Sequence, residues 1–449
     1  MTKTIAKTIF LLCASLLLGA CKETKPAEVG TASKADSLIF SVGAKKDYKR
    51  MLVLVDSFEQ NGEISLINAS RWRGTAYYRQ NQYRTAEYHF KKAMECDIKT
   101  PQDQVSYIKS ARRLSELLLV KGDYEGSLEV AMPAVAKMDE LGIGSDIDYA
   151  ILLNNIGCCQ INLGRDAEAQ ESFYTARQHY INRWSTDSTG RGFQEAVIGT
   201  VYTSMAYINT HRYDKSVYWI NRTEMLLNKY RDKPDARLEY FDEYMGRIEI
   251  MRAVAKMGLN QPDSAAMAYK AFLQTDYSKT YAGRINANDY LMAAHRYEEA
   301  ANNYSYLDQM MIEHDIEKSL DNIQLYLLPK MRANVGAQRR DSEMALALQL
   351  CDALDTAIVR NKSDDTAELA TIYNTQQKEA QIAQQQADLS RQRWVSTLVA
   401  LALIVIFFVI YTWHKRKATM KLSAAHNKLQ KAYDKLEETT AVKENSTPP

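Results

Sequence analysis

Histidine and cysteine are the side chains most able to bind metals or carry out catalysis, and this sequence does not space them for either role. The seven histidines are His89, His179, His211, His295, His314, His414 and His426. None forms the HExxH pair of a zinc protease, and no pair of cysteines has the spacing of a zinc site. We therefore expect no bound metal and no cofactor.

Motifs for phosphate binding and for nucleophilic catalysis are missing as well. The sequence has no Walker loop, no glycine-rich dinucleotide turn and no nucleophile elbow. His426 lies where a kinase could carry a phosphoacceptor, but Asn-Lys-Leu follows it instead of an acidic residue. The balance of 57 basic and 55 acidic residues argues against a nucleic-acid-binding surface. We expect a protein that is not an enzyme and does not bind nucleic acid.

Cys21 has the sequence context of a covalent modification. A basic start and a short apolar run over residues 9–18 indicate an export signal. Leu-Gly-Ala-Cys at 18–21 resembles a bacterial lipobox, which implies that residues 1–20 are a lipoprotein-type signal peptide and that Cys21 carries lipid. The alternative is an ordinary signal peptide with a chance cysteine. Residues 21–35 are polar, as expected of a flexible tether.

A stretch from Trp394 to Trp413 is the most apolar part of the chain. Its 20 residues include no charged side chain, and a helix of that length spans roughly the 30 Å core of a bilayer. A buried core helix is the alternative, although such a helix rarely lacks a polar face. His-Lys-Arg-Lys at 414–417 follows, which places the C-terminal tail in the cytoplasm. We expect a single-pass protein of the bacterial inner membrane with a periplasmic N-terminal region.

The region 36–367 has helical periodicity with an internal repeat. Two windows place small and large residues at the same offsets: Gly74, Ala86, Phe90 and Ala93 in one, and Gly157, Ala169, Phe173 and Ala176 in the other. Both windows resemble the tetratricopeptide repeat consensus. In that repeat two antiparallel helices cross closely at small residues, and successive pairs stack into a superhelix.

We predict an all-α fold, a tetratricopeptide-repeat superhelix of about six or seven helix pairs. Weaker copies of the pattern occur at 114–134, 204–220 and 297–307, and degenerate units are expected around 251–272 and 328–354. Residues 36–58 are expected to begin the array as a helical cap. An ordinary helical bundle is the alternative.

Such an array has a concave face lined by the first helix of each pair. The repeat frame places eight residues on or near that face: Arg71, Thr75, Tyr78, Lys109, Arg112, Asn154, Cys158 and Tyr202. Basic groups and an asparagine there could hold a carboxylate or an extended acidic peptide. The alternative is that the arginines are simply solvated. The expected partner is a protein or peptide ligand in the periplasm.

Helical segments are expected on both sides of the apolar stretch. Residues 368–393 lack glycine and proline and carry a weak alanine seam, which predicts a juxtamembrane helix, either paired or solvated. In the tail, 414–449, residues of a coiled-coil seam recur at heptad spacing: Leu422, Ala425, Leu429, Ala432 and Leu436. We predict a parallel dimeric coiled coil and hence a homodimer. An amphipathic helix on the anionic inner leaflet is the alternative.

The whole chain resembles the sensory half of Bacteroidetes membrane receptors. The most specific phrases are ELATIYNTQQKEAQIAQQQADLSRQRW at 368–394 and LQKAYDKLEETTAVKE at 429–444. In those relatives the linker leads into a histidine kinase, a serine phosphatase or a DNA-binding output. We expect that this output domain is missing here after Lys443, as in a truncated gene or a stand-alone subunit. The resemblance implies a signalling role and a cytoplasmic kinase or phosphatase as partner.

Two other functions remain open. A periplasmic tetratricopeptide-repeat scaffold for complexes at the inner membrane needs the array and the anchor but no communicating coil. A dominant-negative partner of full-length relatives would form mixed dimers through its tail.

Overall fold

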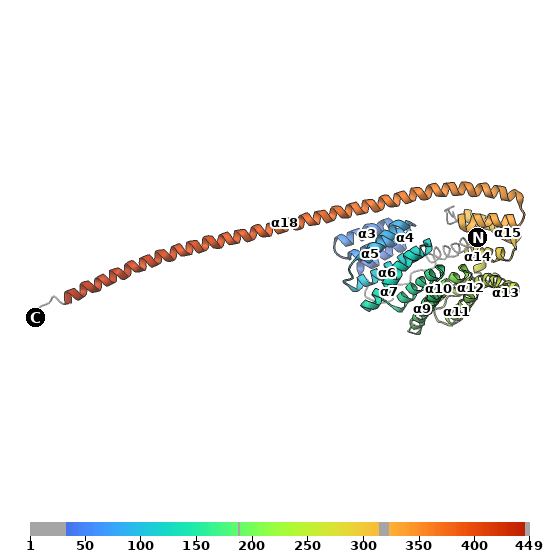
Figure 1. Cartoon of the computed structure of the whole chain (residues 1–449), viewed down its shortest axis with the longest axis horizontal. Coiled ribbons are helices and arrows are strands. Elements are labelled where there is room, and N and C mark those ends of the chain that lie inside the picture. Colours follow the sequence, from blue (N-terminus) through green and yellow to red (C-terminus); the bar gives the residue numbers. More distant parts are fainter. Residues whose placement is uncertain (1–32, 187–188, 314–322, 445–449) are drawn as a thin grey trace. The chain divides into compact units, whose positions relative to one another are not determined.

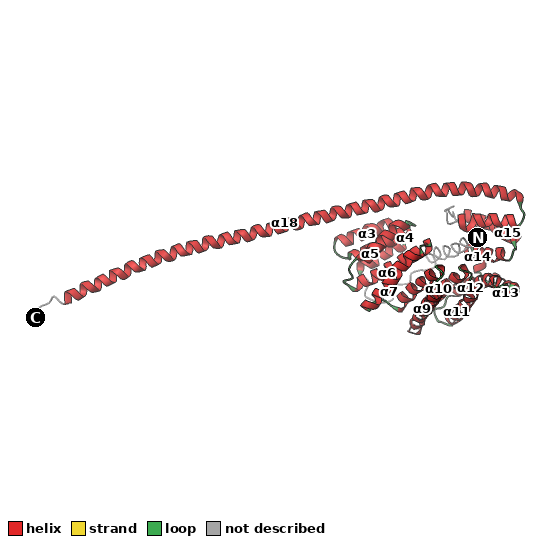
Figure 2. Ribbon diagram, in the orientation of Figure 1, coloured by secondary structure: helices red, strands yellow, loops and turns green. Residues whose placement is uncertain are grey.

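The computed structural model describes residues 33–186, 189–313 and 323–444 (Figure 1). The described residues are helical apart from turns and contain no strand (Figure 2). They divide into two units, Met1–Ile372 and Tyr373–Pro449. The predicted signal peptide, Cys21 and nearly all of the predicted tether lie outside the described residues. The all-α fold class is confirmed.

The first unit is a series of helices joined by short turns. In chain order they are α2 (Lys34–Ala44), α3 (Tyr48–Gln60), α4 (Leu66–Arg79), α5 (Tyr83–Glu95), α6 (Pro101–Lys121), α7 (Tyr124–Leu141), α8 (Asp146–Asn162), α9 (Asp166–Thr186), α10 (Arg191–Asn209), α11 (Tyr213–Arg231), α12 (Leu238–Gly258), α13 (Pro262–Leu273), η1 (Tyr277–Lys279), α14 (Tyr281–Ala293), α15 (Tyr297–Glu313), η2 (Ile323–Leu327), α17 (Leu328–Gly336) and the start of α18 (Arg340–Glu444).

Helices α4 to α15 form six successive pairs among the described residues. They follow a terminal pair, α2 and α3, which is the predicted cap, and α17 with the start of α18 forms one more pair. The prediction of about six or seven pairs after a cap is therefore confirmed. The first helices of neighbouring pairs, α4, α6, α8, α10, α12 and α14, pack against one another and form what we call the first-helix layer.

The same turn closes every described pair. Each turn has one residue with left-handed backbone: Lys46, Asn81, Gly122, Gly164, His211, Asn260, His295 and Gln338. Its N–H bonds to the carbonyl three residues earlier, and the next N–H bonds to the carbonyl five residues earlier. This is the Schellman arrangement, which satisfies carbonyls left over at a helix end. The backbone conformation of the turn therefore repeats even where the sequence consensus is weak.

Glycines in the first helices allow the close crossing that the repeat spacing predicts. A Cβ added at Gly74 would lie 2.6 Å from the ring of Phe90, and one at Gly157 would lie 2.6 Å from the ring of Phe173. Both rings are buried. In each case the ring occupies the space that any side chain at the glycine position would need. A phenylalanine four residues after the predicted alanine therefore requires a glycine twelve residues before that alanine.

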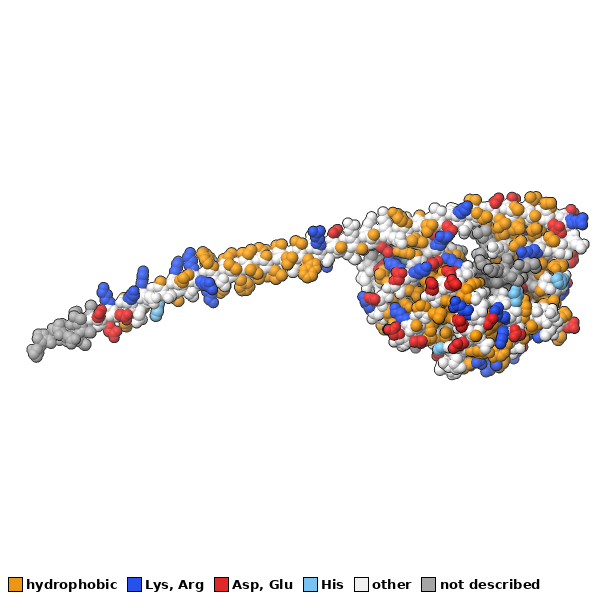
Figure 3. All heavy atoms as spheres, in the orientation of Figure 1, with side chains coloured by type: hydrophobic (Ala, Val, Ile, Leu, Met, Phe, Trp, Pro, Cys, Tyr) orange, Lys and Arg blue, Asp and Glu red, His pale blue; other side chains and the backbone are white. Residues whose placement is uncertain are grey.

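Helix α18 is unbroken from Arg340 to Glu444 and belongs to both units. Its first turns pack on the end of the array, where Ala353 and Ala357 join the core that includes Tyr326 and Ala333. Within the second unit, each large apolar side chain from Val395 to Tyr411 is more than half exposed. Figure 3 shows this apolar stretch with Lys and Arg side chains on both flanks. Among the described residues, α18 is the one helix long and apolar enough to cross a membrane.

The second unit also contains the predicted dimer seam. Leu422, Leu429 and Leu436 are each at least 66% exposed in the single chain, and Ala425 and Ala432 are exposed as well. An apolar heptad stripe on an exposed helix leaves its contact surface open to a second helix.

Candidate binding surface of the helical array

Arg71 holds together the first turns of the array. Its guanidinium contacts the Asp36 carboxylate at 3.2 Å, and both side chains are 5% exposed. The same carboxylate accepts hydrogen bonds from Asn68, Trp72 and Gln102 at 2.5–3.2 Å. Burial lowers the pKa of Arg71 to about 10, although the Asp36 charge opposes this. Arg71 is therefore committed to an internal network rather than open to a ligand.

Lys109 and Arg112 lie about one turn apart on α6, and they differ in their partners. Arg112 donates to the Asp148 carboxylate of α8 at 2.6 Å. Burial alone would raise the pKa of Asp148, but the Arg112 charge and hydrogen bonds from Ser145 hold it below its ordinary value. Lys109 has no hydrogen-bond or ion-pair partner among the described residues and reaches the surface. Crowding by protein and the charges of Arg71 and Arg112 lower its pKa to about 8.

The remaining predicted residues are mostly engaged inside the array. Thr75 donates to the Arg71 carbonyl of its own helix at 2.8 Å. Tyr78 is buried, and its ring meets that of Tyr83 edge-on.

Asn154 bridges α8 and α10 rather than facing solvent. Its amide donates to the Gly199 carbonyl at 3.2 Å and to Thr203 Oγ1 at 2.8 Å. Cys158 donates to Asn154 Oδ1 at 3.8 Å, and burial raises the pKa of its thiol. Tyr202 is half-buried on α10. The structure thus brings Arg71, Lys109 and Arg112 together, and separately Asn154 and Cys158.

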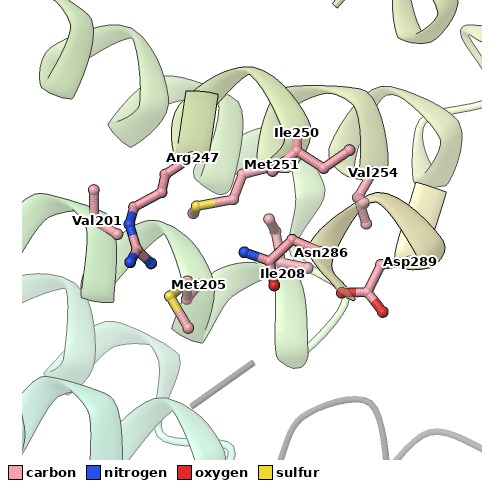
Figure 4. Close-up of a pocket in the computed structure, with 9 residues that line it drawn as sticks. All are labelled: Val201, Met205, Ile208, Arg247, Ile250, Met251, Val254, Asn286 and Asp289. Atoms are coloured by element: carbon pink, nitrogen blue, oxygen red, sulfur yellow. The ribbon is translucent and has the colours of Figure 1, made fainter. Parts of the chain in front are cut away.

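A pocket lies farther along the first-helix layer, between α10, α12 and α14 (Figure 4). It is a small concavity that is partly open to solvent. The lining residues are Val201, Met205 and Ile208 of α10, Arg247, Ile250, Met251 and Val254 of α12, and Asn286 and Asp289 of α14. Apolar side chains from two helices therefore face polar groups from the third.

The two charged residues of the pocket differ in their environment. Arg247 donates from Nε and Nη2 to Glu243 Oε1 at 3.0 and 2.8 Å, and its guanidinium lies 5.0 Å from the ring centre of Tyr277. Asp289 has no hydrogen-bond or ion-pair partner among the described residues, and burial raises its pKa to about 7. An unpaired carboxylate beside apolar walls is a recurring mark of a binding site.

This pocket was not predicted from the sequence. Its α12 residues fall in a degenerate repeat unit, so there was no consensus frame from which inward positions could be transferred. The available signal was the spacing of Met205 and Ile208 on one helix and of Ile250, Met251 and Val254 on the next. That spacing predicts an apolar helix face, but a packed core gives the same pattern.

Three histidines, His89, His211 and His295, contact tyrosines within the array. Among residues 33–186, 189–313 and 323–444, no group of three or more His, Cys, Asp or Glu side chains could hold a metal ion. His89 stacks on Tyr77, and burial lowers its pKa to about 3. His211 and His295 each contact the hydroxyl of the tyrosine two residues later at 2.6 Å, within the Schellman turns.

A polar contact joins α18 to the start of α5, 283 residues away in sequence. The Glu368 carboxylate accepts a hydrogen bond from the Thr85 backbone N–H at 2.8 Å, and Glu368 is 9% exposed. Gln82, the N-cap residue of α5, makes no side-chain capping bond of its own. Asp365 and Arg84 add an ion pair at 2.8 Å beside it. Helix α18 thus packs on the last pair and caps a helix near the beginning of the array.

Comparisons with known proteins add distant likenesses of fold. No protein-family model matches the sequence, and no curated protein matches it. The apo form of RapI has a TM-score of 0.42 at 14% sequence identity, over 68% of this chain and 98% of that chain. A tetratricopeptide repeat protein from Parabacteroides merdae ATCC 43184 has a TM-score of 0.41 at 14% identity, over 62% of this chain and 92% of that chain. At this distance the likenesses carry no argument, and the description of the fold rests on the repeated pairs and turns themselves.

Proposed function

We propose that this chain is a membrane-anchored periplasmic binding protein that acts as the sensory part of a signal-transduction receptor. Stacked helix pairs of this kind are a protein-binding architecture in general. The export signal, the lipid on Cys21 and the span 394–413 would hold both ends of the array at the inner membrane. An impermeant maleimide should then label Ser390→Cys in intact spheroplasts but Ser423→Cys only after lysis; equal labelling at both sites would contradict this topology.

The observation that carries the sensory role is the capping of α5 by Glu368. A passive anchor needs only a tether to the membrane. Helix α18 instead contacts both the last pair of the array and α5, near its beginning, before it continues toward the apolar stretch. A change in the stacking of the pairs would therefore strain or release the contact on α5. The same helix continues into the tail, so the contact would connect binding to the predicted coil through one continuous element.

The free energy that the capping contact could pass on to the tail is small, but it is enough to shift a marginal coil. A side-chain cap contributes about 0.5–2 kcal/mol to a helix, and a ligand shifts an equilibrium only by its differential affinity for the two states. The tail seam covers fewer than three heptads, which is marginal for an isolated helix pair. A marginal coil responds to a shift of that size, and confinement to the membrane would keep its partner near.

Photo-cross-linking from the first-helix layer, from a second helix and from the tail tests the proposal. A photo-activated amino acid at Lys109, in the first-helix layer, should capture an exported protein in native cells. The same group at Tyr174, which is 41% exposed on α9, serves as the matched control and should capture much less. Mass spectrometry of material cross-linked through the tail should recover a cytoplasmic kinase, phosphatase or receptor.

The outcomes separate the sensor from a scaffold. If only exported proteins are recovered, and deletion of residues 422–443 leaves the cellular phenotype unchanged, the chain gathers proteins without signalling. If Lys109 and Tyr174 capture the same proteins equally, the first-helix layer is not the binding surface.

A further inference from the structure

We infer that the pocket between α10, α12 and α14 receives an aliphatic side chain of a peptide and that Asp289 pairs with a cationic group next to it, a lysine, an arginine or a free amino terminus. This rests on the proposed function, because it names the ligand chemistry of the binding array. It differs from the acidic ligand that the basic residues of α4 and α6 suggested.

The walls of the pocket favour an aliphatic group. Six of the nine lining residues are apolar, and α10 and α12 supply all six (Figure 4). Met205 and Met251 bring unbranched, adaptable side chains that can reshape around a guest. The pocket is small and open to solvent, so it suits the end of one leucine or methionine side chain better than a folded domain surface.

The polar edge of the pocket consists of acceptors. Asp289 and Asn286 lie three residues apart on α14, so their side chains share one face. The Asn286 amide nitrogen donates to the Tyr277 hydroxyl at 2.8 Å, which leaves its carbonyl oxygen available to a ligand. Asp289 offers a carboxylate with no partner among residues 33–186, 189–313 and 323–444. Both groups accept hydrogen bonds, so they favour a ligand that donates hydrogen bonds over an anionic ligand.

The cation that lines the pocket is already neutralised. Arg247 is 7% exposed at its side chain and pairs with Glu243 at 2.8 Å, so it offers little attraction to an acidic ligand. The remaining uncompensated charge is therefore negative. An ammonium or guanidinium group beside the aliphatic side chain would satisfy Asp289 and relieve the unfavourable burial of its charge.

Peptide selection on the full chain tests the inference directly. A phage-displayed library of random dodecapeptides is selected against the chain in lipid nanodiscs, and the dissociation constant of the strongest peptide is measured by fluorescence anisotropy. We expect enrichment of Leu, Ile or Met next to Lys or Arg. Asp289→Asn should weaken binding of that peptide at least tenfold, and Val254→Phe, which fills the pocket, should weaken it similarly.

Controls separate this inference from loss of folding and from the wider proposal. Asp232→Asn changes a carboxylate that is 78% exposed and should leave the affinity unchanged, and no variant should melt more than a few degrees below the wild type. Enriched peptides without a cation, or equal affinity for Asp289→Asn and the wild type, would overturn the inference. So would the absence of any enriched peptide. In those cases specific capture of an exported protein at Lys109 would still support the binding function, at another part of the layer.

Discussion

The buried carboxylate of Asp289 makes its own contribution to the pH dependence of stability. Burial raises the pKa of Asp289 to about 7, whereas an unfolded aspartate titrates near pH 4, about its ordinary value. Between these values the unfolded chain loses the proton and the folded chain keeps it. The contribution of Asp289 to the free energy of unfolding should therefore fall as the pH rises from about 4 to about 7, and level off above. Burial and the Asp289 charge both raise the pKa of Tyr304 on α15, so Tyr304 stays protonated across this range.

Asp289→Asn should remove this pH dependence. Urea unfolding in nanodiscs should show the variant to be more stable than the wild type at pH 8, with a difference that shrinks toward pH 4. Asp232→Asn should follow the wild-type curve. Parallel curves for Asp289→Asn and the wild type would show that the carboxylate is not buried without a partner.

Arg71 and Lys109 were predicted together, and the structure gives them opposite roles. Removing one partner of a buried ion pair costs about 3–5 kcal/mol, so Arg71→Ala should lower the free energy of unfolding by about that amount. Lys109→Ala removes no described contact and should change it by less than about 0.5 kcal/mol. Urea unfolding followed by tryptophan fluorescence measures both. Equal effects would mean that the Asp36 network does not hold the first turns.

This pair also shows what the sequence could not tell. The repeat frame placed both residues on first helices, because the position within a helix follows from the spacing of small and large residues. It could not identify Asp36 as the partner of Arg71, since that carboxylate comes from the cap helix, 35 residues away. Availability to a ligand depends on the partner, and the partner is set by packing.

At the scale of elements, the capping of α5 by Glu368 predicts a local effect. Glu368→Ala should destabilise the first turn of α5 by about 1 kcal/mol and speed hydrogen exchange of the Thr85 amide by several-fold. Asp365→Ala removes only a surface ion pair, worth about 0–1 kcal/mol, and leaves the capping bond in place. Unchanged exchange at Thr85 in the Glu368 variant would contradict the contact.

The tail helix predicts an effect on association. Leu429→Lys places a charge in the apolar seam and should abolish disulfide cross-linking between tails at an introduced Ser423→Cys. Lys431→Glu, on another face of the same helix, should leave it largely intact. Persistence of the cross-link in the Leu429 variant would rule out a coil through this seam and favour a helix lying on the inner leaflet.

Elements differed in how far the sequence revealed them. Gly157 and Phe173 identified a repeat in the sequence because the Phe173 ring fills the space that a side chain at position 157 would need. The α12–α13 pair lacks that signal, yet its turn at Asn260 has the same backbone as the others. The contact of Glu368 with α5 could not have been predicted, because it depends on how far the stacked pairs bring their two ends together.

At the scale of the whole molecule, one chain contains the proposed binding layer, a capping contact and an apolar helix. Helix α18 takes part in the last two, and it continues without a break into the predicted seam. The alternative scaffold would share every one of these parts except the dependence of the tail on the array. That dependence is the claim on which the two functions differ.

The most direct test is the rate of disulfide cross-linking between tails at Ser423→Cys, in native membranes, with and without Glu368→Ala. The account predicts that loss of the α5 cap changes the rate severalfold, while Asp232→Asn, a remote exposed carboxylate, leaves it unchanged. Identical rates with and without Glu368 would contradict communication between array and tail, and would leave the chain as a membrane-bound scaffold.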